Sequence, residues 1–371
     1  SGDKGNASNI AIIARDPAYV PLLRREVTPE KIAAHFDGLV FGKVTRFEVP
    51  DDDAGHAHAL YATLREVDDR GLDVVLAVLG GAIRVGTPFL FVSLGECLTE
   101  KSGRINLGLE GVLVLSAMAG FGGSYLTGSA WAGVLIAGGS GALLALLHGL
   151  LCSLGRVNDI ATGIALMLLG SGLAFYLGKA LIQPQAAQIP AIDLGMWSDS
   201  AQVQAALRIN ALFPIGVLLA VLMAWAFANT RWGLIVRMAG DSSDAARALG
   251  YSVNTVRVLA TAVGGFIAGL GGASLSLHYP GSWNEGLSSG QGLIAVALVI
   301  FARWRPMACL GAALLFGGAG ALGPALQSVG ISAGYHLFNA MPYALTLLIL
   351  VWTCSPRQAL QGAPMELNVS R

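Results

Sequence analysis

The segment Trp232–Gly272 reads WGLIVRMAGDSSDAARALGYSVNTVRVLATAVGGFIAGLGG and joins a polar, arginine-bearing part to a long apolar one. Ser242 or Ser243 can cap a short helix, the alanines after them favour it, and Gly250 can end it, because glycine tolerates the left-handed conformation. The apolar run Val258–Leu277 that follows has about the 20 residues that a membrane-spanning helix needs. This order predicts a short helix that lies along the membrane surface between two spans.

A small helix of this kind suits docking into a groove on a soluble partner, since alanine side chains allow close approach and the glycine turn fixes the angle of the helix. Spacing alone is equally compatible with an ordinary loop between two helices. The residues Asp244-Ala245-Ala246 followed by Gly250 resemble the E-A-A-x-x-x-G coupling loop of ABC-transporter permeases, with Asp in place of Glu. In that family the ATPase subunit docks on this loop, so the resemblance assigns ATPase coupling to these four residues.

Several other stretches resemble one branch of these permeases, which imports nucleosides, simple sugars and branched-chain amino acids. They are Arg231–Leu234, Gly264–Gly272, Gly95-Glu96 with Ser102–Gly111, Gly292–Leu298 with Trp304–Pro306, and Met341–Tyr343. The resemblance covers about residues 80–355 and is closest to the nucleoside members, with simple sugars next. It implies three protein partners: a cytoplasmic ATP-binding subunit, a second permease subunit and an extracytoplasmic substrate-binding protein.

The composition is that of a protein built largely inside a lipid bilayer. Of 371 residues, 54% are hydrophobic and 12% are charged, and 49 are glycine; a soluble domain carries about 25% charged residues. The net charge of zero and the lack of a basic stripe argue against a nucleic-acid partner. The four cysteines lie in or beside apolar runs without the paired spacing of metal ligands, so we expect them to be packing residues.

Apolar runs separated by short polar breaks predict an all-α, polytopic membrane protein, a helical bundle of about nine spans. The runs are 74–95, 105–126, 130–154, 160–180, 211–229, 258–277, 287–302, 307–327 and 336–354. The run 287–302 is short for a full crossing. Together the runs define a permease domain over residues 74–356, which is followed by a cytoplasmic tail at 357–371.

Basic residues mark alternate connections between the predicted spans. They are Lys101, Arg104, Arg156, Arg231, Arg237, Arg247, Arg257, Arg303, Arg305 and Arg357. By the positive-inside rule these connections are cytoplasmic, which places the predicted short helix where an ATPase can reach it. We therefore expect a multi-pass protein of the bacterial plasma membrane.

Residues 1–50 form a segment of a different kind, polar and patterned as strand, helix and strand. Four stretches resemble the C-terminal domain of the acyclic terpene utilisation family: Ser1–Asn6, Asn9-Ile10, Ile13–Pro17 and Arg46–Pro50. The resemblance fades near Pro50, so we predict a small, truncated α+β fragment, which is too short to bury much core alone. Residues 51–73, acidic and then helical in pattern, are predicted to be a linker.

The charge alternation places this N-terminal segment outside the cell, yet no signal-peptide pattern opens the sequence. Three explanations are open. The junction at residues 50–71 is a fusion or an assembly artefact, or the segment is a tolerated extension, or the span count is wrong by one. We favour the first.

Polar residues in or beside the predicted spans are candidates for a solute pathway, because such groups are costly in lipid. They are Arg84, Asn106, Glu110, Gln291 and Asn339. Asn106 and Glu110 are four residues apart and would share one helix face. The alternatives are that Arg84 reaches the membrane interface and that the amides bond neighbouring helices. On the outer side, the loop 278–285 with its Trp283 is either a seat for a binding protein or a solvated loop.

No phosphate-binding loop of the form G-x-x-x-x-G-K-[ST] occurs, and the glycine clusters at 264–272 and 317–323 lie inside apolar runs, where small residues let helices approach closely. The sequence thus predicts the permease subunit of an ATP-driven importer for nucleosides or simple sugars, which is not an enzyme and needs no cofactor. Two other functions stay open: an ion-coupled transporter or channel for a small polar solute, and an enzyme that uses the N-terminal piece.

Overall fold

The computed structural model describes residues 53–154, 157–197, 204, 207–278, 280–328, 340–353 and 362–369. The α+β fragment predicted over residues 1–50 lies outside them. The fold described below is that of one compact unit, formed by Leu76–Leu322 and His336–Arg371.

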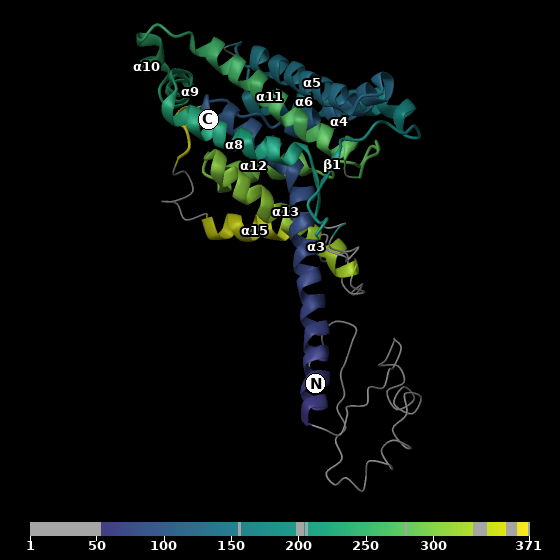
Figure 1. Cartoon of the computed structure of the whole chain (residues 1–371). Helices are drawn as coiled ribbons and strands as arrows, with labels where there is room; N and C mark the ends of the chain where they lie inside the picture. The colour runs from purple at the N-terminus through teal and green to yellow at the C-terminus, as the bar shows by residue number, and fades with distance from the viewer. Residues whose placement is uncertain are drawn as a thin grey trace. The chain divides into compact units, whose positions relative to one another are not determined.

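The unit is mostly helical (Figure 1). The described helices are α3 (Asp53–Lys101), α4 (Leu109–Thr127), α5 (Ala130–Leu151), α6 (Asp159–Gly178), α8 (Leu212–Asn229), α9 (Arg231–Asp241), α10 (Ser243–Ala248), α11 (Val253–Leu277), α12 (Gln291–Phe301), α13 (Pro306–Ser328), α15 (Met341–Thr353) and α16 (Glu366–Val369). A 3-10 helix, η2 (Lys179–Leu181), continues α6, and two short strands, β1 (Ala191–Asp193) and β2 (Arg208–Asn210), pair antiparallel. The segment predicted as a linker is helical from Asp53 and continues into the first span within α3.

Seven of the described helices are long and apolar enough to cross a membrane. Their candidate spans are Val78–Lys101, Leu109–Thr127, Ala130–Leu151, Asp159–Leu181, Leu212–Asn229, Val253–Leu277 and Pro306–Leu326. Helices α12 and α15 have 11 and 13 residues, fewer than the roughly 20 of a full crossing. The protein is therefore a polytopic helical membrane protein. The count of nine spans stays a prediction, because residues 329–339 are not among those described.

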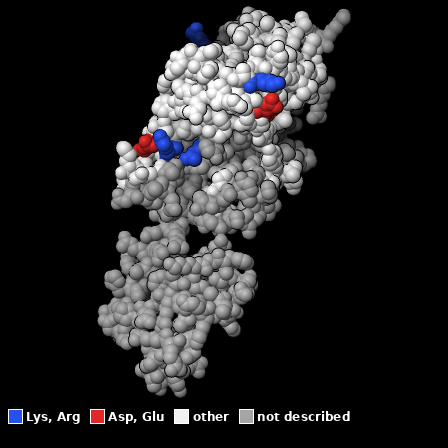
Figure 2. All heavy atoms as spheres, turned by 90° about the vertical axis from the view of Figure 1, so that its right-hand side faces the viewer, with Lys and Arg blue, Asp and Glu red and all other residues white. Residues whose placement is uncertain are grey.

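The spans differ in how much protein surrounds them. In α4, 78% of the most apolar part of the span is buried inside the protein, whereas in α6 and in α8 only 28% of it is. The outer sides of these two helices carry large apolar side chains, among them Leu168, Tyr176 and Trp225. Figure 2 shows the molecule from the right-hand side of Figure 1, which is an end of the bundle and not the sides of α6 and α8, and few of the described side chains there are charged. Helix α4 is thus central, and α6 and α8 present apolar sides to lipid.

Small residues let α11 pack tightly against both α4 and α5. A Cβ atom placed on Gly272 of α11 would lie 2.7 Å from the backbone nitrogen of Ala117 in α4. A Cβ atom on Gly141 of α5 would lie 3.0 Å from the Cα atom of Gly269 in α11. Side chains larger than hydrogen do not fit at these contacts. The prediction that the cluster 264–272 packs helices is confirmed.

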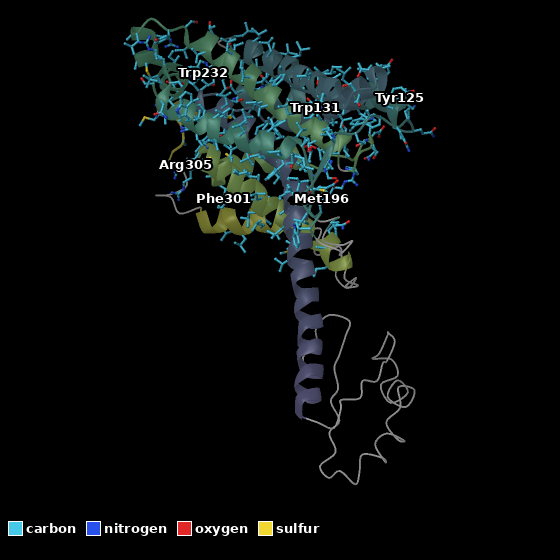
Figure 3. All side chains as sticks on the ribbon, viewed as in Figure 1. Tyr125, Trp131, Met196, Trp232, Phe301 and Arg305 are labelled. Atoms are coloured by element: carbon cyan, nitrogen blue, oxygen red, sulfur yellow. The ribbon has the colours of Figure 1, made fainter. Side chains whose placement is uncertain are left out.

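Both ends of the bundle carry an exposed aromatic residue, and the end with α9 and α10 also carries Arg305. Trp232 and Arg305 lie at the end where α9 and α10 are found, and Tyr125 lies at the opposite end (Figure 3). Trp232 and Tyr125 are both exposed, as aromatic residues at the two surfaces of a membrane are. The end that carries α10 is thus the one with arginine-bearing connections.

Candidate functional site

The coupling segment, which we define as residues 242–250, forms a capped helix and a glycine turn. Ser242 accepts a hydrogen bond from the N–H of Ala245 at 3.3 Å and so caps α10. Gly250 has a φ of +84°, the left-handed conformation that favours glycine, and it lies in open space. The predicted short helix is confirmed, and of the two candidate serines Ser242 is the cap.

Most side chains of α10 face solvent. Asp244 and Arg247 form an ion pair at 3.0 Å, with side chains that are 92% and 61% exposed. Leu249, just beyond the helix, is 66% exposed. Ala246 turns inward and packs with Ala239 of α9 in a small apolar cluster. The segment therefore offers a partner protein both charged and apolar contacts on a base that is packed against the permease.

Arg257, early in the second turn of α11, connects the packed side of α10 to the membrane spans. Its Nε donates to the carbonyl of Ser102 at 3.0 Å, and its Nη2 donates to the carbonyl of Ala239 at 2.9 Å. The same Nη2 lies 3.3 Å from Oε2 of Glu366, whose Oε1 accepts a hydrogen bond from the N–H of Ser243 at 2.9 Å. Sequence reasoning treated Arg257 only as a cytoplasmic charge and had no signal for Glu366, which lies far away in the chain.

Two carboxylates are buried at the same end of α3. Oε1 of Glu96 accepts a hydrogen bond from the N–H of Asn106 at 2.9 Å, and Glu100 accepts one from Nε1 of Trp304. The two glutamates are 0% and 3% exposed. They hold the turn before α4 and the turn after α12 against α3. The family-like stretches around Glu96 and Trp304 pointed to this region, but Glu100 was missed.

Asn106 does not share a helix face with Glu110, because α4 begins only at Leu109. Its Oδ1 accepts a hydrogen bond from the N–H of Gly108 at 2.9 Å, and the residue is buried. Asparagine often bonds its own backbone two residues on, which stabilises a turn in place of a helix. The prediction of a shared face is wrong for this reason.

Glu110, in the first turn of α4, binds the start of α12. Its carboxylate accepts hydrogen bonds from Oγ of Ser288 at 2.5 Å, the N–H of Gly290 at 3.1 Å and the N–H of Gly292 at 2.7 Å. N–H groups at the start of a helix have no partner within the helix, and Glu110 provides one. Gln291 lies between the two glycines, and its Oε1 is buried without a hydrogen-bond partner. The structure thus brings Glu110 and Gln291 together.

Two pathway candidates remain, Arg84 and Asn339. The positive charge of Arg84 repels a protonated His278, the residue that follows α11. Burial is the largest cause and the charges of Arg84 and Arg208 come next, and together they lower the pKa of the His278 imidazole to about 4. His278 is therefore neutral at pH 7. Asn339 lies outside the described residues.

Trp283 is not part of an exposed seat for a binding protein. It is 1% exposed, and its Nε1 donates to the carbonyl of Gly178 at 2.9 Å. A buried tryptophan finds a partner for its N–H in this way, and here it ties the outer loop to the end of α6. The neighbouring Asn284 and Glu285 are exposed.

Comparison with known proteins divides the chain at residue 78. The family described as "Branched-chain amino acid transport system / permease component" matches residues 78–352. The "AtuA ferredoxin-like domain" matches residues 1–78. The second match confirms the resemblance of the N-terminal segment and runs past Pro50, where the sequence comparison had lost it.

Individual relatives share the permease part. The putative glucose ABC transporter permease protein TsgC13 of Haloferax volcanii is 34% identical over 299 residues, which are 79% of this chain and 89% of that protein. The guanosine ABC transporter permease protein NupQ of Bacillus subtilis is 26% identical over 307 residues, 75% of this chain and 92% of NupQ. The nucleoside ABC transporter permease protein NupC of Lactococcus lactis subsp. cremoris is 25% identical over 292 residues, 74% of this chain and 90% of NupC.

The family match, over residues 78–352, covers the seven spans, the coupling segment and the region around Glu110. The chain therefore belongs to the family of permease components of branched-chain amino acid transport systems, and it is a multi-pass protein of the cell membrane.

Proposed function

We propose that the chain is the permease subunit of an ATP-driven importer for nucleosides or simple sugars. The observation that carries this proposal is the coupling segment: an exposed, capped helix at the arginine-bearing end, with Asp244-Ala245-Ala246 and Gly250 in the order of a coupling loop. The glucose, guanosine and nucleoside transporters among the relatives support the substrate class.

In this proposal a cytoplasmic ATP-binding subunit docks on Asp244, Ala245, Ala246 and the turn at Gly250. Closure of the ATPase pushes α10, and the packing of Ala246 on α9 passes the displacement to the spans. The permease then alternates between conformations open to either side. A second permease subunit and an extracytoplasmic substrate-binding protein complete the assembly.

The solute would pass the start of α12. Both carboxylate oxygens of Glu110 are occupied by hydrogen bonds, whereas the Oε1 of Gln291 is buried and has no partner. A sugar or ribose hydroxyl can donate to that oxygen, so we assign Gln291 to solute contact and Glu110 to holding the site. Arg84 and Asn339 stay further candidates, and Asn106 serves the turn before α4. The proposed topology keeps nine spans.

Uptake of labelled guanosine and glucose tests the proposal, in cells that express the chain with its ATPase and binding protein. The key variant is Gly250→Asp, and the matched control is Gly128→Asp. Both glycines have positive φ, +84° and +69°, and both lie in open space, but Gly128 is in the turn between α4 and α5, away from the coupling segment.

We expect Gly250→Asp to lower uptake by about tenfold or more at a normal amount in the membrane, because a side chain strains the left-handed turn and adds a negative charge where the ATPase docks. Gly128→Asp should stay within about twofold of wild type. Uptake that persists without the ATPase would reject the importer and leave the ion-coupled transporter as the better account.

A further inference from the structure

The C-terminal segment Gly362–Val369 packs against the permease and is not a free tail. Gly362 has a φ of +94° and lies against the turn after α12, where a Cβ atom would come within 3.2 Å of the carbonyl of Arg303. Pro364 is buried, and Ala363 and Leu367 pack on the main apolar core. This packing brings Glu366 to a fixed place beside the coupling segment.

Glu366 bridges α10 and α11 at a point away from the short backbone turn that joins these two helices. Its Oε1 accepts a hydrogen bond from the N–H of Ser243, the first residue of α10, at 2.9 Å. Its Oε2 lies 3.3 Å from Nη2 of Arg257, with the two side chains 22% and 13% exposed. A charge-assisted contact that is mostly shielded from water is stronger than an ion pair on the surface.

The electrostatics of the carboxyl group agree with this geometry. Burial by itself raises the pKa of Glu366, but the hydrogen bonds from Ser243 and the positive charge of Arg257 outweigh burial and lower it. The carboxylate is therefore charged at neutral pH. Arg257 passes the connection on, because it also binds the carbonyls of Ser102 after α3 and Ala239 in α9.

We infer that the C-terminal segment is a strut that couples α10 to the spans, with Glu366 as its positioning residue. Without the strut, α10 keeps its own cap at Ser242, and among the described residues its remaining ties to α11 are the backbone turn and the small cluster around Ala246. ATPase closure would then move α10 without moving α3 and α11 to the same extent. This inference rests on the proposed docking of the ATPase at α10.

The test uses the complete importer in proteoliposomes and measures solute uptake and ATP hydrolysis in the same sample. Glu366→Gln keeps the size of the side chain and removes its charge, and Glu366→Ala removes both contacts. Met365→Ala is the control, because Met365 is the neighbouring residue and is 70% exposed. Binding of the ATPase to the permease is measured for each variant.

We expect the number of solute molecules moved per ATP hydrolysed to fall by about threefold or more in Glu366→Gln and further in Glu366→Ala. The reason is that the loss of a charge-assisted contact shifts the balance toward a detached segment by about tenfold. The ATPase should stay bound, and Met365→Ala should behave as wild type. Hydrogen exchange at the first turn of α10 should become faster in both Glu366 variants.

An unchanged ratio in both Glu366 variants, in a complex where Gly250→Asp abolishes uptake, would overturn the strut and leave the proposed function intact. Loss of ATPase binding with an unchanged ratio in the complexes that form would also overturn it, because the segment would then belong to the docking surface. If Gly250→Asp leaves uptake unchanged as well, the proposed function fails together with the strut.

Discussion

Glu110 and Glu366 each accept a hydrogen bond from an N–H in the first turn of a helix that lies far away in sequence, 182 and 123 residues from them. The carboxylate of Glu110 accepts hydrogen bonds from three donors, and all three belong to a single segment at the start of α12. Glu366 divides its carboxylate between α10 and Arg257 at the edge of the molecule.

This difference suggests different roles: Glu110 fixes one segment in place, and Glu366 transmits movement between two elements. A carboxylate with all its donors on one segment fixes that segment, and we expect its loss to cost stability. A carboxylate shared between two elements makes them move together, and we expect its loss to cost coupling while the fold survives. The two glutamates therefore predict opposite patterns in stability and transport.

The largest expected effect is that of Glu110→Ala on stability. The substitution leaves two N–H groups and a hydroxyl without their acceptor in a partly buried segment, at a cost of about 3 kcal/mol. The melting temperature in detergent should fall by several degrees, and Glu110→Gln, which keeps an acceptor oxygen, should lie between it and wild type.

Asp244→Ala is the matched control for this measurement, because the Asp244 side chain is 92% exposed and its removal should change stability by less than about 0.5 kcal/mol. Equal melting temperatures for Glu110→Ala and Asp244→Ala would show that Glu110 does not hold α12.

A smaller effect concerns the pH dependence of Glu366. Its pKa in the folded protein is lowered, so the unfolded or detached form binds the proton more readily and the carboxylate stabilises the attached segment at higher pH. That stabilisation is complete above the ordinary glutamate pKa of about 4.3 and is lost as the pH falls through the lowered value.

Hydrogen exchange over residues 362–369 should therefore be constant from pH 7 to about 5, after correction for the intrinsic rate, and should accelerate below about pH 4. In Glu366→Gln the corrected rate should not change with pH. Acceleration already between pH 7 and 6 would assign the attachment of the segment to a different group.

Features that depend on residues close together in the chain could be predicted from the sequence. The coupling segment was predictable because its cap, alanines and Gly250 are neighbours in the chain and act locally. The apolar runs predicted a polytopic helical protein, because lipid demands long apolar helices. Local patterns also predicted that the glycines of α11 pack helices.

Contacts between distant residues could not be predicted. No local pattern around Glu366 indicates its contact with Ser243. The loop that Glu110 binds lies beyond six further α-helices of the described part of the chain. Asn106 was misplaced because a spacing of four residues suggests a helix even where an asparagine forms a turn. Trp283 was misplaced because a tryptophan in a polar loop resembles a binding residue until its buried partner, Gly178, is known.

The central claim is that α10 receives the ATPase, and site-directed cross-linking in membranes tests it most directly. A cysteine replaces exposed Ala245 in one variant and Met196, which is 84% exposed on the connection before α8, in the other. The native Cys97, Cys152 and Cys309 are buried, and the wild-type chain gives the background. The account predicts that Ala245→Cys cross-links to the ATPase subunit and Met196→Cys does not. An active importer in which Ala245→Cys fails to cross-link, while Met196→Cys succeeds, would contradict it.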